Sequence, residues 1–161
     1  MGTGKSVVGQ LAAKMLGLSF LDSDLEIEKK YKTSASEIFK IHGEIGFREM
    51  ERNFILSGHP KSGCLVSCGG GLPIGEGMIE MLKSNGKVFT LWASPKTIFE
   101  RTKKNSSRPL LQTEDPFSKI TELLSEREVK YRKADKIIST DVRSVSEVAA
   151  LIQKNYLEEL N

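Results

Sequence analysis

Hydrophobic residues along this chain follow two patterns that alternate from one end to the other. Short continuous apolar runs predict strands over residues 18–21, 64–68, 87–92 and 136–139. Helical spacing predicts helices over 5–16, 24–30, 34–43, 44–57, 75–84 and 117–131, with two more opened by Ser94 and Ser144. This alternation predicts the α/β class, in which helices cover both faces of a parallel sheet. Ligands of such sheets bind beyond the carboxyl ends of the strands, so residues that follow each strand are the first functional candidates.

Polar residues mark several helix starts. Ser34 and Glu37 form a capping box, and Ser94 is placed as an N-cap with Pro95 at the first helical position. Residues 103–116 instead contain two prolines and many polar side chains. This composition predicts a mobile loop that is long enough to act as a lid.

The start of the first helix carries a phosphate-binding pattern. Residues 2–6, Gly-Thr-Gly-Lys-Ser, match the second half of the P-loop motif G-x-x-x-x-G-K-[ST] directly before a helix. Glycine lets the backbone curl so that its N–H groups face phosphate oxygens, while Lys5 can reach the β and γ phosphates and Ser6 can coordinate Mg²⁺. A short match can arise by chance, but the acidic and glycine-rich strand ends that follow favour binding of a nucleoside triphosphate.

The complete P-loop motif requires another glycine five residues before Gly4, at a position that precedes Met1. The apolar strand that normally leads into the loop is also missing, a difference of roughly five or six residues. We therefore expect the sheet to lack its first strand, and the neighbouring strands to expose unpaired backbone groups. We expect such a chain to have low stability and little activity.

Charged residues follow the next strand and helix. Asp22 and Asp24 stand at a strand end, where one carboxylate could face a metal ion and the other a substrate hydroxyl. Acidic residues at a helix N-terminus are the alternative. Arg48 precedes Glu51 by three residues, and a guanidinium held by a glutamate is a rigid fork that recognises a carboxylate. A surface salt bridge is the alternative for this pair.

Three consecutive glycines, residues 69–71, follow a buried strand immediately. Such a run is costly to order, which indicates a group that approaches the backbone too closely for side chains, with a flexible turn as the alternative. Arg108 lies in the expected lid and Arg127 in a helix. Either could be a solvated arginine, but a lid arginine is suited to neutralise charge during phosphoryl transfer.

Six short motifs together, in the correct order and spacing, resemble the shikimate kinase family over essentially the whole chain. They are MGTGKS (1–6), DSD (22–24), GFREME (46–51), CGGG (68–71), RT with RPLL (101–102 and 108–111) and REVKY (127–131). The resemblance implies a P-loop NTPase of the nucleoside-monophosphate-kinase type: one three-layer α/β/α domain over residues 1–161 with a five-stranded parallel sheet. It also implies ATP-dependent phosphorylation of the 3-hydroxyl of shikimate, on the route to chorismate and the aromatic amino acids. One departure is Cys68, where the family often has threonine.

For the nucleotide, the resemblance implies a site at the start of the first helix and at two later segments. Mg²⁺ would be held by Ser6 and Asp22. Arg108 would bind the nucleotide and touch the transferring phosphoryl group as the lid closes. The other contacts to ATP would come from Gly2, Thr3, Gly4, Lys5, Ser6, Arg101, Thr140 and Asp141.

For the acceptor, the resemblance implies a binding region over about residues 23–57, with additions from later segments. Asp24 would bind the hydroxyls and accept the proton of the 3-hydroxyl, so that the catalytic set is Lys5, Asp24 and Arg108. The shikimate carboxylate would be bound by Arg48 and Arg127. The ring would be covered from the backbone side by Gly69, Gly70 and Gly71.

Composition limits the other classes of function. The 161 residues are 39% hydrophobic and 28% charged, with a net charge of +3 and scattered basic residues, which gives no support for nucleic-acid binding. No apolar stretch approaches the roughly 20 residues of a membrane span. Since no secretory or transit signal is visible, we expect a cytoplasmic protein, or a plastid protein if the source is a plant. We also expect a monomer. Cys64 and Cys68 are expected to be reduced and buried rather than disulfide-bonded or bound to zinc.

Two other functions stay open. Another small P-loop kinase, such as a gluconate-type sugar-acid kinase, would share the phosphate loop and the lid, whereas the DSD, FREME and GGG motifs favour shikimate. A relative that binds nucleotide without catalysis is the second alternative. The missing strand favours that alternative, and the retention of the expected site residues opposes it.

Overall fold

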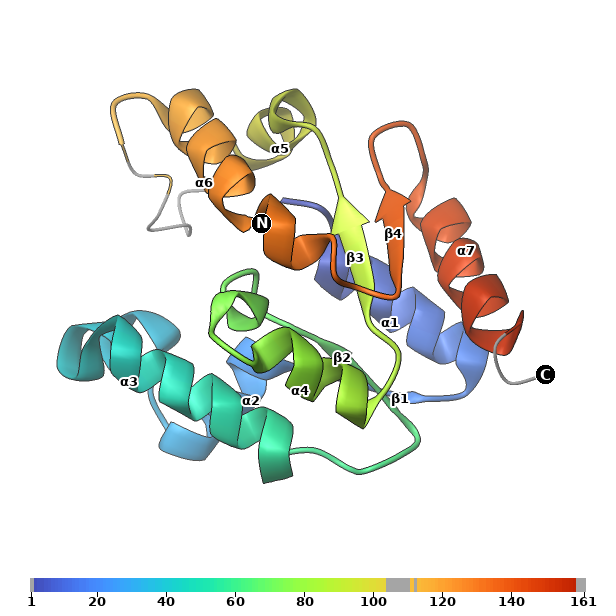
Figure 1. Cartoon of the computed structure of the whole chain (residues 1–161), viewed down its shortest axis with the longest axis horizontal. Coiled ribbons are helices and arrows are strands. Elements are labelled where there is room, and N and C mark those ends of the chain that lie inside the picture. Colours follow the sequence, from blue (N-terminus) through green and yellow to red (C-terminus); the bar gives the residue numbers. More distant parts are fainter. Residues whose placement is uncertain (1, 104–110, 112, 159–161) are drawn as a thin grey trace.

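The structure, a computed structural model, describes residues 2–103, 111 and 113–158. Strands and helices alternate in this part of the chain, as the hydrophobic pattern predicts (Figure 1). The strands are β1 (Ser19–Asp22), β2 (Cys64–Ser67), β3 (Phe89–Trp92) and β4 (Lys136–Ser139). The helices are α1 (Lys5–Leu16), α2 (Ser23–Tyr31), α3 (Ala35–Ser57), α4 (Met78–Asn85), α5 (Pro95–Thr102), α6 (Pro116–Tyr131) and α7 (Val145–Glu158), with a 3₁₀ turn η1 (Leu72–Ile74).

Helix ends follow the local polar signals. Ser34 Oγ accepts a hydrogen bond from the backbone N of Glu37 at 3.2 Å, and Ser94 Oγ accepts one from the backbone N of Thr97 at 3.3 Å. The two helices expected on either side of Gly43 form one element, α3, with a kink at that residue. Gly43 has a φ of 67°, a left-handed conformation that glycine adopts without a steric cost.

The strands form two separate parallel pairs. β1 pairs with β2, with Ser19 opposite Cys64, and β3 pairs with β4, with Phe89 opposite Lys136. The expected parallel direction is confirmed, but one continuous sheet is not formed, because no strand in the described part of the chain joins β2 to β3. Among the described residues, β2 and β3 therefore each have one edge without a partner strand.

Three clusters of buried apolar side chains hold the helices against the strands. One joins α2, α3 and α4 around Val66, and the second joins α1 and α7 around Leu65. Because Leu65 and Val66 are consecutive residues of β2, they point to opposite faces, so helices cover both faces of this pair. The third cluster joins α5 and α6 next to Trp92.

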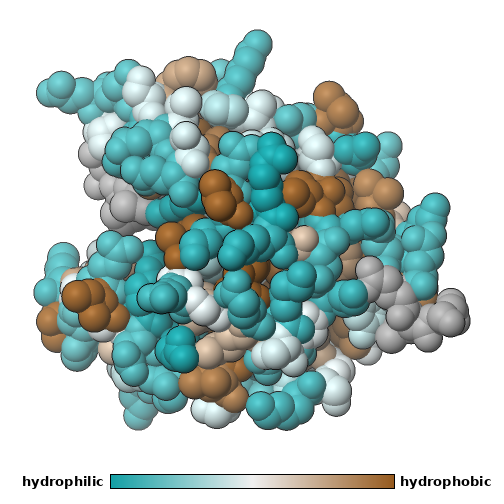
Figure 2. Space-filling view, in the orientation of Figure 1, coloured by the Kyte–Doolittle hydropathy of each residue, from teal (hydrophilic) through white to brown (hydrophobic). Residues whose placement is uncertain are grey.

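The molecular surface is largely hydrophilic on the face that Figure 2 shows, with small, separate apolar patches. Within the described ranges, no helix has both the length and the apolar character that a membrane crossing requires. Cys64 and Cys68 are free thiols, so no disulfide joins them. Both are only partly buried, which corrects the expectation of buried thiols.

Candidate active site

The phosphate-binding loop leads into α1 and packs against α5. Gly2 and Gly4 have φ values of 66° and 84°, in the left-handed region that favours glycine. A Cβ atom on Gly2 would lie 3.0 Å from side-chain carbons of both Ile98 and Thr102. Gly4 is the N-cap of α1 and has no side chain to cap it, so the amide groups that begin this helix suit an anionic ligand.

The residues predicted to hold a metal ion lie together beside this loop. Ser6 Oγ donates a hydrogen bond to Asp22 Oδ2 at 2.9 Å, and Asp22 Oδ1 accepts one from the backbone N of Asp24 at 3.2 Å. Hydroxyl and carboxylate oxygens are the ligands that Mg²⁺ prefers, usually together with water and nucleotide phosphates. The described residues contain no group of three or more His, Cys, Asp or Glu side chains that could hold a metal ion alone. The pair therefore fits an ion that arrives with a nucleotide.

Asp24 lies between this pair and the expected acceptor region. Burial raises the pKa of Asp24, the neighbouring Asp22 carboxylate raises it further, and Lys5 lowers it. Lys5 of the phosphate loop is therefore close enough to Asp24 for their charges to interact. A carboxylate with a raised pKa is a stronger proton acceptor, which suits Asp24 for a general base.

Arg48 is held by two glutamates of its own helix. Its Nη1 donates to Glu51 Oε2 at 2.5 Å, and its Nη2 donates to Glu44 Oε1 at 2.9 Å. The Glu51 side chain is only 2% exposed, whereas that of Arg48 is 27% exposed. Burial raises the pKa of Glu51 to about 7, although Arg48 acts in the opposite direction. The pair is therefore not an ordinary surface salt bridge, because an interior carboxylate orients a partly exposed guanidinium.

The glycine run lies against these side chains. A Cβ atom on Gly69 would lie 2.7 Å from Asp24 Oδ1 and 3.0 Å from Glu51 Oε1, and one on Gly71 would lie 2.6 Å from Arg48 Cζ. The sequence predicts that some group approaches this backbone too closely for side chains. The structure identifies groups of the protein itself, two carboxylates and a guanidinium, in that position.

Tyr131 connects the glycine run to α6, and the sequence analysis missed this residue. Its Oη donates a hydrogen bond to the backbone O of Gly70 at 2.6 Å. Burial raises the pKa of Tyr131, and the nearby Arg127 and Arg48 act to lower it. The two arginines expected to bind a carboxylate therefore lie around one phenol. The available signal was the position of Tyr131 four residues after Arg127, on the same face of a helix.

Ser23 is a second residue that the sequence analysis missed. It is fully buried, and its Oγ accepts a hydrogen bond from the backbone N of Gly69 at 3.0 Å. This contact fixes the start of the glycine run beside β1. Its only signal in the sequence was its place between two acidic candidates, Asp22 and Asp24.

The residues expected near adenine also lie together. Arg101 Nη1 donates to Thr140 Oγ1 at 2.9 Å, and its Nη2 donates to the backbone O of Thr140 at 2.6 Å. Asp141 Oδ1 accepts a hydrogen bond from the backbone N of Ser94 at 2.9 Å. Burial acts to raise the pKa of Asp141, but the hydrogen bonds from Ser94 and Thr97 lower it overall. Asp141 thus fixes this segment, while Arg108 and most of the expected lid, residues 103–116, lie outside the described residues.

Comparison with known proteins identifies the family. A family model described as shikimate kinase matches residues 1–157. The chain belongs to the shikimate kinase family. The shikimate kinase of Thermodesulfovibrio yellowstonii is 44% identical over 156 residues, which cover 97% of this chain and 90% of that protein. The shikimate kinase of Caldanaerobacter subterraneus is 37% identical over 158 residues, 98% of this chain and 92% of that protein.

Solved structures of shikimate kinases have the same fold. The enzyme of Acinetobacter baumannii in complex with shikimate matches with a TM-score of 0.90 at 35% identity, over 99% of this chain and 89% of that one. The enzyme of Aquifex aeolicus matches with a TM-score of 0.82 at 33% identity, over 98% and 92% of the two chains. The predicted α/β fold of the P-loop NTPase class is confirmed, and the family to which this chain belongs is one of phosphotransferases.

Proposed function

We propose that this chain transfers the γ-phosphoryl group of ATP to the 3-hydroxyl of shikimate, giving shikimate 3-phosphate and ADP on the route to chorismate. The observation that carries the proposal is Arg48, held by Glu51 and Glu44 beside Asp24 and the glycine run. A fixed, partly exposed guanidinium suits a carboxylate ligand, and shikimate combines a carboxylate with ring hydroxyls. The named complex of the Acinetobacter baumannii enzyme with shikimate supports this choice of acceptor.

On the acceptor side, Arg48 and Arg127 would bind the carboxylate, and the backbone of residues 69–71 would lie against the ring. Asp24 would bind the ring hydroxyls and accept the proton of the 3-hydroxyl as the oxygen attacks phosphorus. Its raised pKa supports this role. Such positioning of the two reactants is the main contribution that a protein makes to phosphoryl transfer.

On the nucleotide side, the loop from Gly2 to Gly4 would cradle the phosphates, with Lys5 against the β and γ groups. Ser6 and Asp22 would hold Mg²⁺ with the nucleotide, and the bound ion would neutralise charge on the phosphate oxygens. Adenine would lie near Arg101, Thr140 and Asp141. Arg108 of the expected lid would contact the transferring phosphoryl group, as the family resemblance implies.

One domain of residues 1–161 would carry both sites, with the acceptor region over about residues 23–57, and would act as a monomer. Tyr131 supports this arrangement, because it joins α6 to the glycine run by a hydrogen bond between residues 61 positions apart. Two segments assigned to the acceptor, the glycine run and α6, are thus joined directly.

A coupled assay of ADP release with two acceptors tests the proposal. Shikimate and gluconate both carry a carboxylate and hydroxyl groups, so gluconate is a matched control for the alternative sugar-acid kinase. We expect turnover of ATP to depend on shikimate, with kcat/KM at least about 100-fold above that for gluconate. An equal or higher kcat/KM with gluconate would show that shikimate is not the acceptor. Binding of ATP with neither acceptor phosphorylated would favour the non-catalytic alternative.

A further inference from the structure

Tyr131 lies at the end of a stripe of α6 residues that faces the protein interior. Ile120 and Leu124 of this stripe are buried in the cluster that joins α6 to α5. Arg127 and Tyr131 follow at steps of three and four residues, so they lie on the same face of the helix. Packing of the apolar part of the stripe therefore fixes the side from which the guanidinium and the phenol leave the helix.

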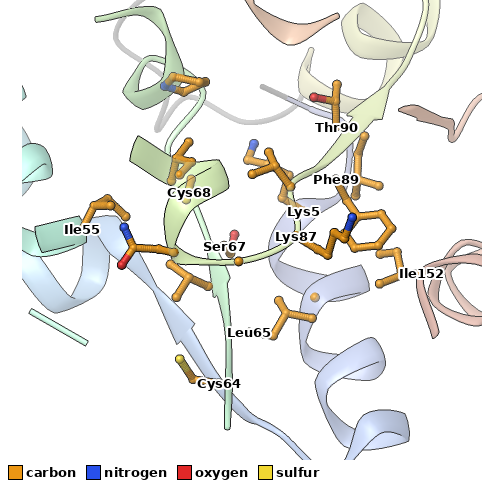
Figure 3. Close-up of a pocket in the computed structure, with 18 of the residues that line it drawn as sticks. Lys5, Ile55, Cys64, Leu65, Ser67, Cys68, Lys87, Phe89, Thr90 and Ile152 are labelled. Carbon is orange, nitrogen blue, oxygen red and sulfur yellow. The ribbon is translucent and has the colours of Figure 1, made fainter. Parts of the chain in front are cut away.

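Two hydrogen bonds hold Tyr131 at its backbone and at the tip of its side chain. Its backbone O accepts a hydrogen bond from Thr90 Oγ1 of β3 at 3.0 Å, and its Oη donates one to the backbone O of Gly70 at 2.6 Å. Thr90, Gly70 and Tyr131 all line one cavity of about 410 Å³. Figure 3 shows Thr90 and Cys68, which precedes the glycine run, on opposite sides of this cavity. Tyr131 thus links β3 to the glycine run.

The direction of the hydrogen bonds at the phenol follows from the chemistry of its partners. The carbonyl oxygen of Gly70 can only accept, so the single phenol proton lies on that bond. Burial raises the pKa of Tyr131, and a side-chain hydrogen bond from Arg127 acts in the opposite direction. A guanidinium can only donate, so Arg127 uses a lone pair of the phenol oxygen. The order of donation is therefore from Arg127 to Tyr131 and from Tyr131 to Gly70.

The second cation of the expected carboxylate site lies close to the same phenol. The charge of Arg48 also lowers the pKa of Tyr131, and a Cβ atom on Gly71 would lie 2.6 Å from Arg48 Cζ. Two guanidinium groups that bind one carboxylate repel each other until the acceptor arrives. Each therefore needs a fixed partner. Glu51 is a partner of Arg48, and the partner that the structure gives Arg127 is the phenol of Tyr131.

We propose that Tyr131 is a positioning residue that holds Arg127 beside Arg48 and so sets the preference of the enzyme for an acceptor with a free carboxylate. This inference rests on the proposed function, in which the two arginines bind that carboxylate. Tyr131 acts through Arg127 and donates nothing to the acceptor, because its only proton is used by Gly70.

A purely structural role is the competing explanation, because Tyr131 also joins α6, β3 and the glycine run. Loss of a structural support would impair every acceptor to the same extent. Loss of a support for Arg127 would impair a charged acceptor more than an uncharged one. The ratio of kcat/KM for shikimate to kcat/KM for its methyl ester separates the two roles, because the ester keeps the ring hydroxyls and lacks the negative charge.

This ratio is measured first in the wild type and in Tyr131→Phe, which keeps the ring and removes the hydroxyl. We expect a ratio of about 100 in the wild type and a ratio about 5- to 10-fold lower in Tyr131→Phe, mainly through the KM for shikimate. Both acceptors are assayed on one preparation, so a smaller folded fraction cannot change the ratio. Tyr156→Phe is the matched control, because Tyr156 lines the same cavity from α7, and it should keep the wild-type ratio.

Arg127→Ala and the double variant Arg127→Ala/Tyr131→Phe complete the test. We expect Arg127→Ala to lower the ratio at least about 10-fold and the double variant to lower it no further, because the phenol acts through the guanidinium. A wild-type ratio in Tyr131→Phe, together with a low ratio in Arg127→Ala, would overturn the positioning role and leave the proposed function intact. A wild-type ratio in Arg127→Ala would overturn both, because the carboxylate would then bind elsewhere.

Discussion

Arg48 Nη1 lies 2.5 Å from Glu51 Oε2, and the glutamate of this pair is buried while the arginine is partly exposed. Burial alone would favour a neutral Glu51, and it raises the pKa of this carboxyl to about 7 against the opposing effect of Arg48. Ionised Glu51 in the protein interior therefore lowers the stability of the fold. It also holds the Arg48 guanidinium in one orientation beside the glycine run.

The first prediction concerns the pH dependence of stability. The pKa of Glu51 rises from its ordinary 4.5 to about 7 on folding, so the folded protein holds this proton more tightly than the unfolded chain. Its contribution to stability is complete below about pH 4.5 and is lost as pH rises through 7. Between pH 4.5 and 8 we expect the free energy of unfolding in urea to fall by on the order of 2–3 kcal/mol more in the wild type than in Glu51→Gln. Parallel curves for the two proteins would contradict the assignment.

The second prediction separates acceptor binding from chemistry. Arg48→Ala would remove the charge-assisted contact that we propose to the acceptor carboxylate, so the KM for shikimate should rise by about 10- to 100-fold. Lys5→Ala should instead lower kcat by at least about 100-fold and leave the Kd for shikimate nearly unchanged, because the proposed role of Lys5 is to contact the phosphates. Steady-state kinetics and calorimetric titration with shikimate measure these quantities. Equal loss of shikimate affinity in both variants would contradict this division of roles between Arg48 and Lys5.

The third prediction concerns the glycine run. Alanine at Gly71 would place a Cβ atom 2.6 Å from Arg48 Cζ, so the guanidinium would have to move. We expect Gly71→Ala to raise the KM for shikimate about 10-fold with a smaller effect on the KM for ATP. Gly86→Ala is the matched control, because its Cβ would meet nothing within 4 Å and the backbone is extended there. The same change in KM from both variants would show that the effect is not local.

The fourth prediction concerns the nucleotide side. Arg101 donates two hydrogen bonds to Thr140, so Arg101→Ala should release the segment expected near adenine. The KM for ATP should rise by about 5- to 20-fold, which corresponds to one or two lost hydrogen bonds, while the Kd for shikimate stays constant. Lys96→Ala, on the same helix α5, serves as the control. A rise in the Kd for shikimate without a change in the KM for ATP would place Arg101 on the acceptor side.

Local features of this protein could be predicted from the sequence because their causes are local. The Ser34 cap and the Ser94 cap each depend on residues three positions apart, and both hydroxyls accept the expected backbone hydrogen bond. The predicted capping box at Ser34 is only half formed, because the Glu37 side chain pairs with Lys40. The Arg48 and Glu51 pair follows from spacing within one helix. The meeting of Ser6 and Asp22 follows from the rule that functional residues gather at the carboxyl ends of parallel strands.

Features set by packing between distant segments could not be predicted in the same way. The contact of Tyr131 with Gly70 joins residues 61 positions apart, and the raised pKa of Glu51 depends on how deeply α3 packs. The glycine run signals a close approach, but only the fold shows that Asp24 and Arg48 make that approach.

Product analysis by NMR tests the central claim most directly. The chain is incubated with ATP, Mg²⁺ and shikimate, and the position of the new phosphate is read from its phosphorus–proton couplings while ADP is measured in the same sample. The account predicts equal amounts of ADP and shikimate phosphorylated on the 3-hydroxyl, with product lost in Asp24→Asn. Phosphate on a different hydroxyl, or ADP formed without phosphorylated shikimate, would contradict it.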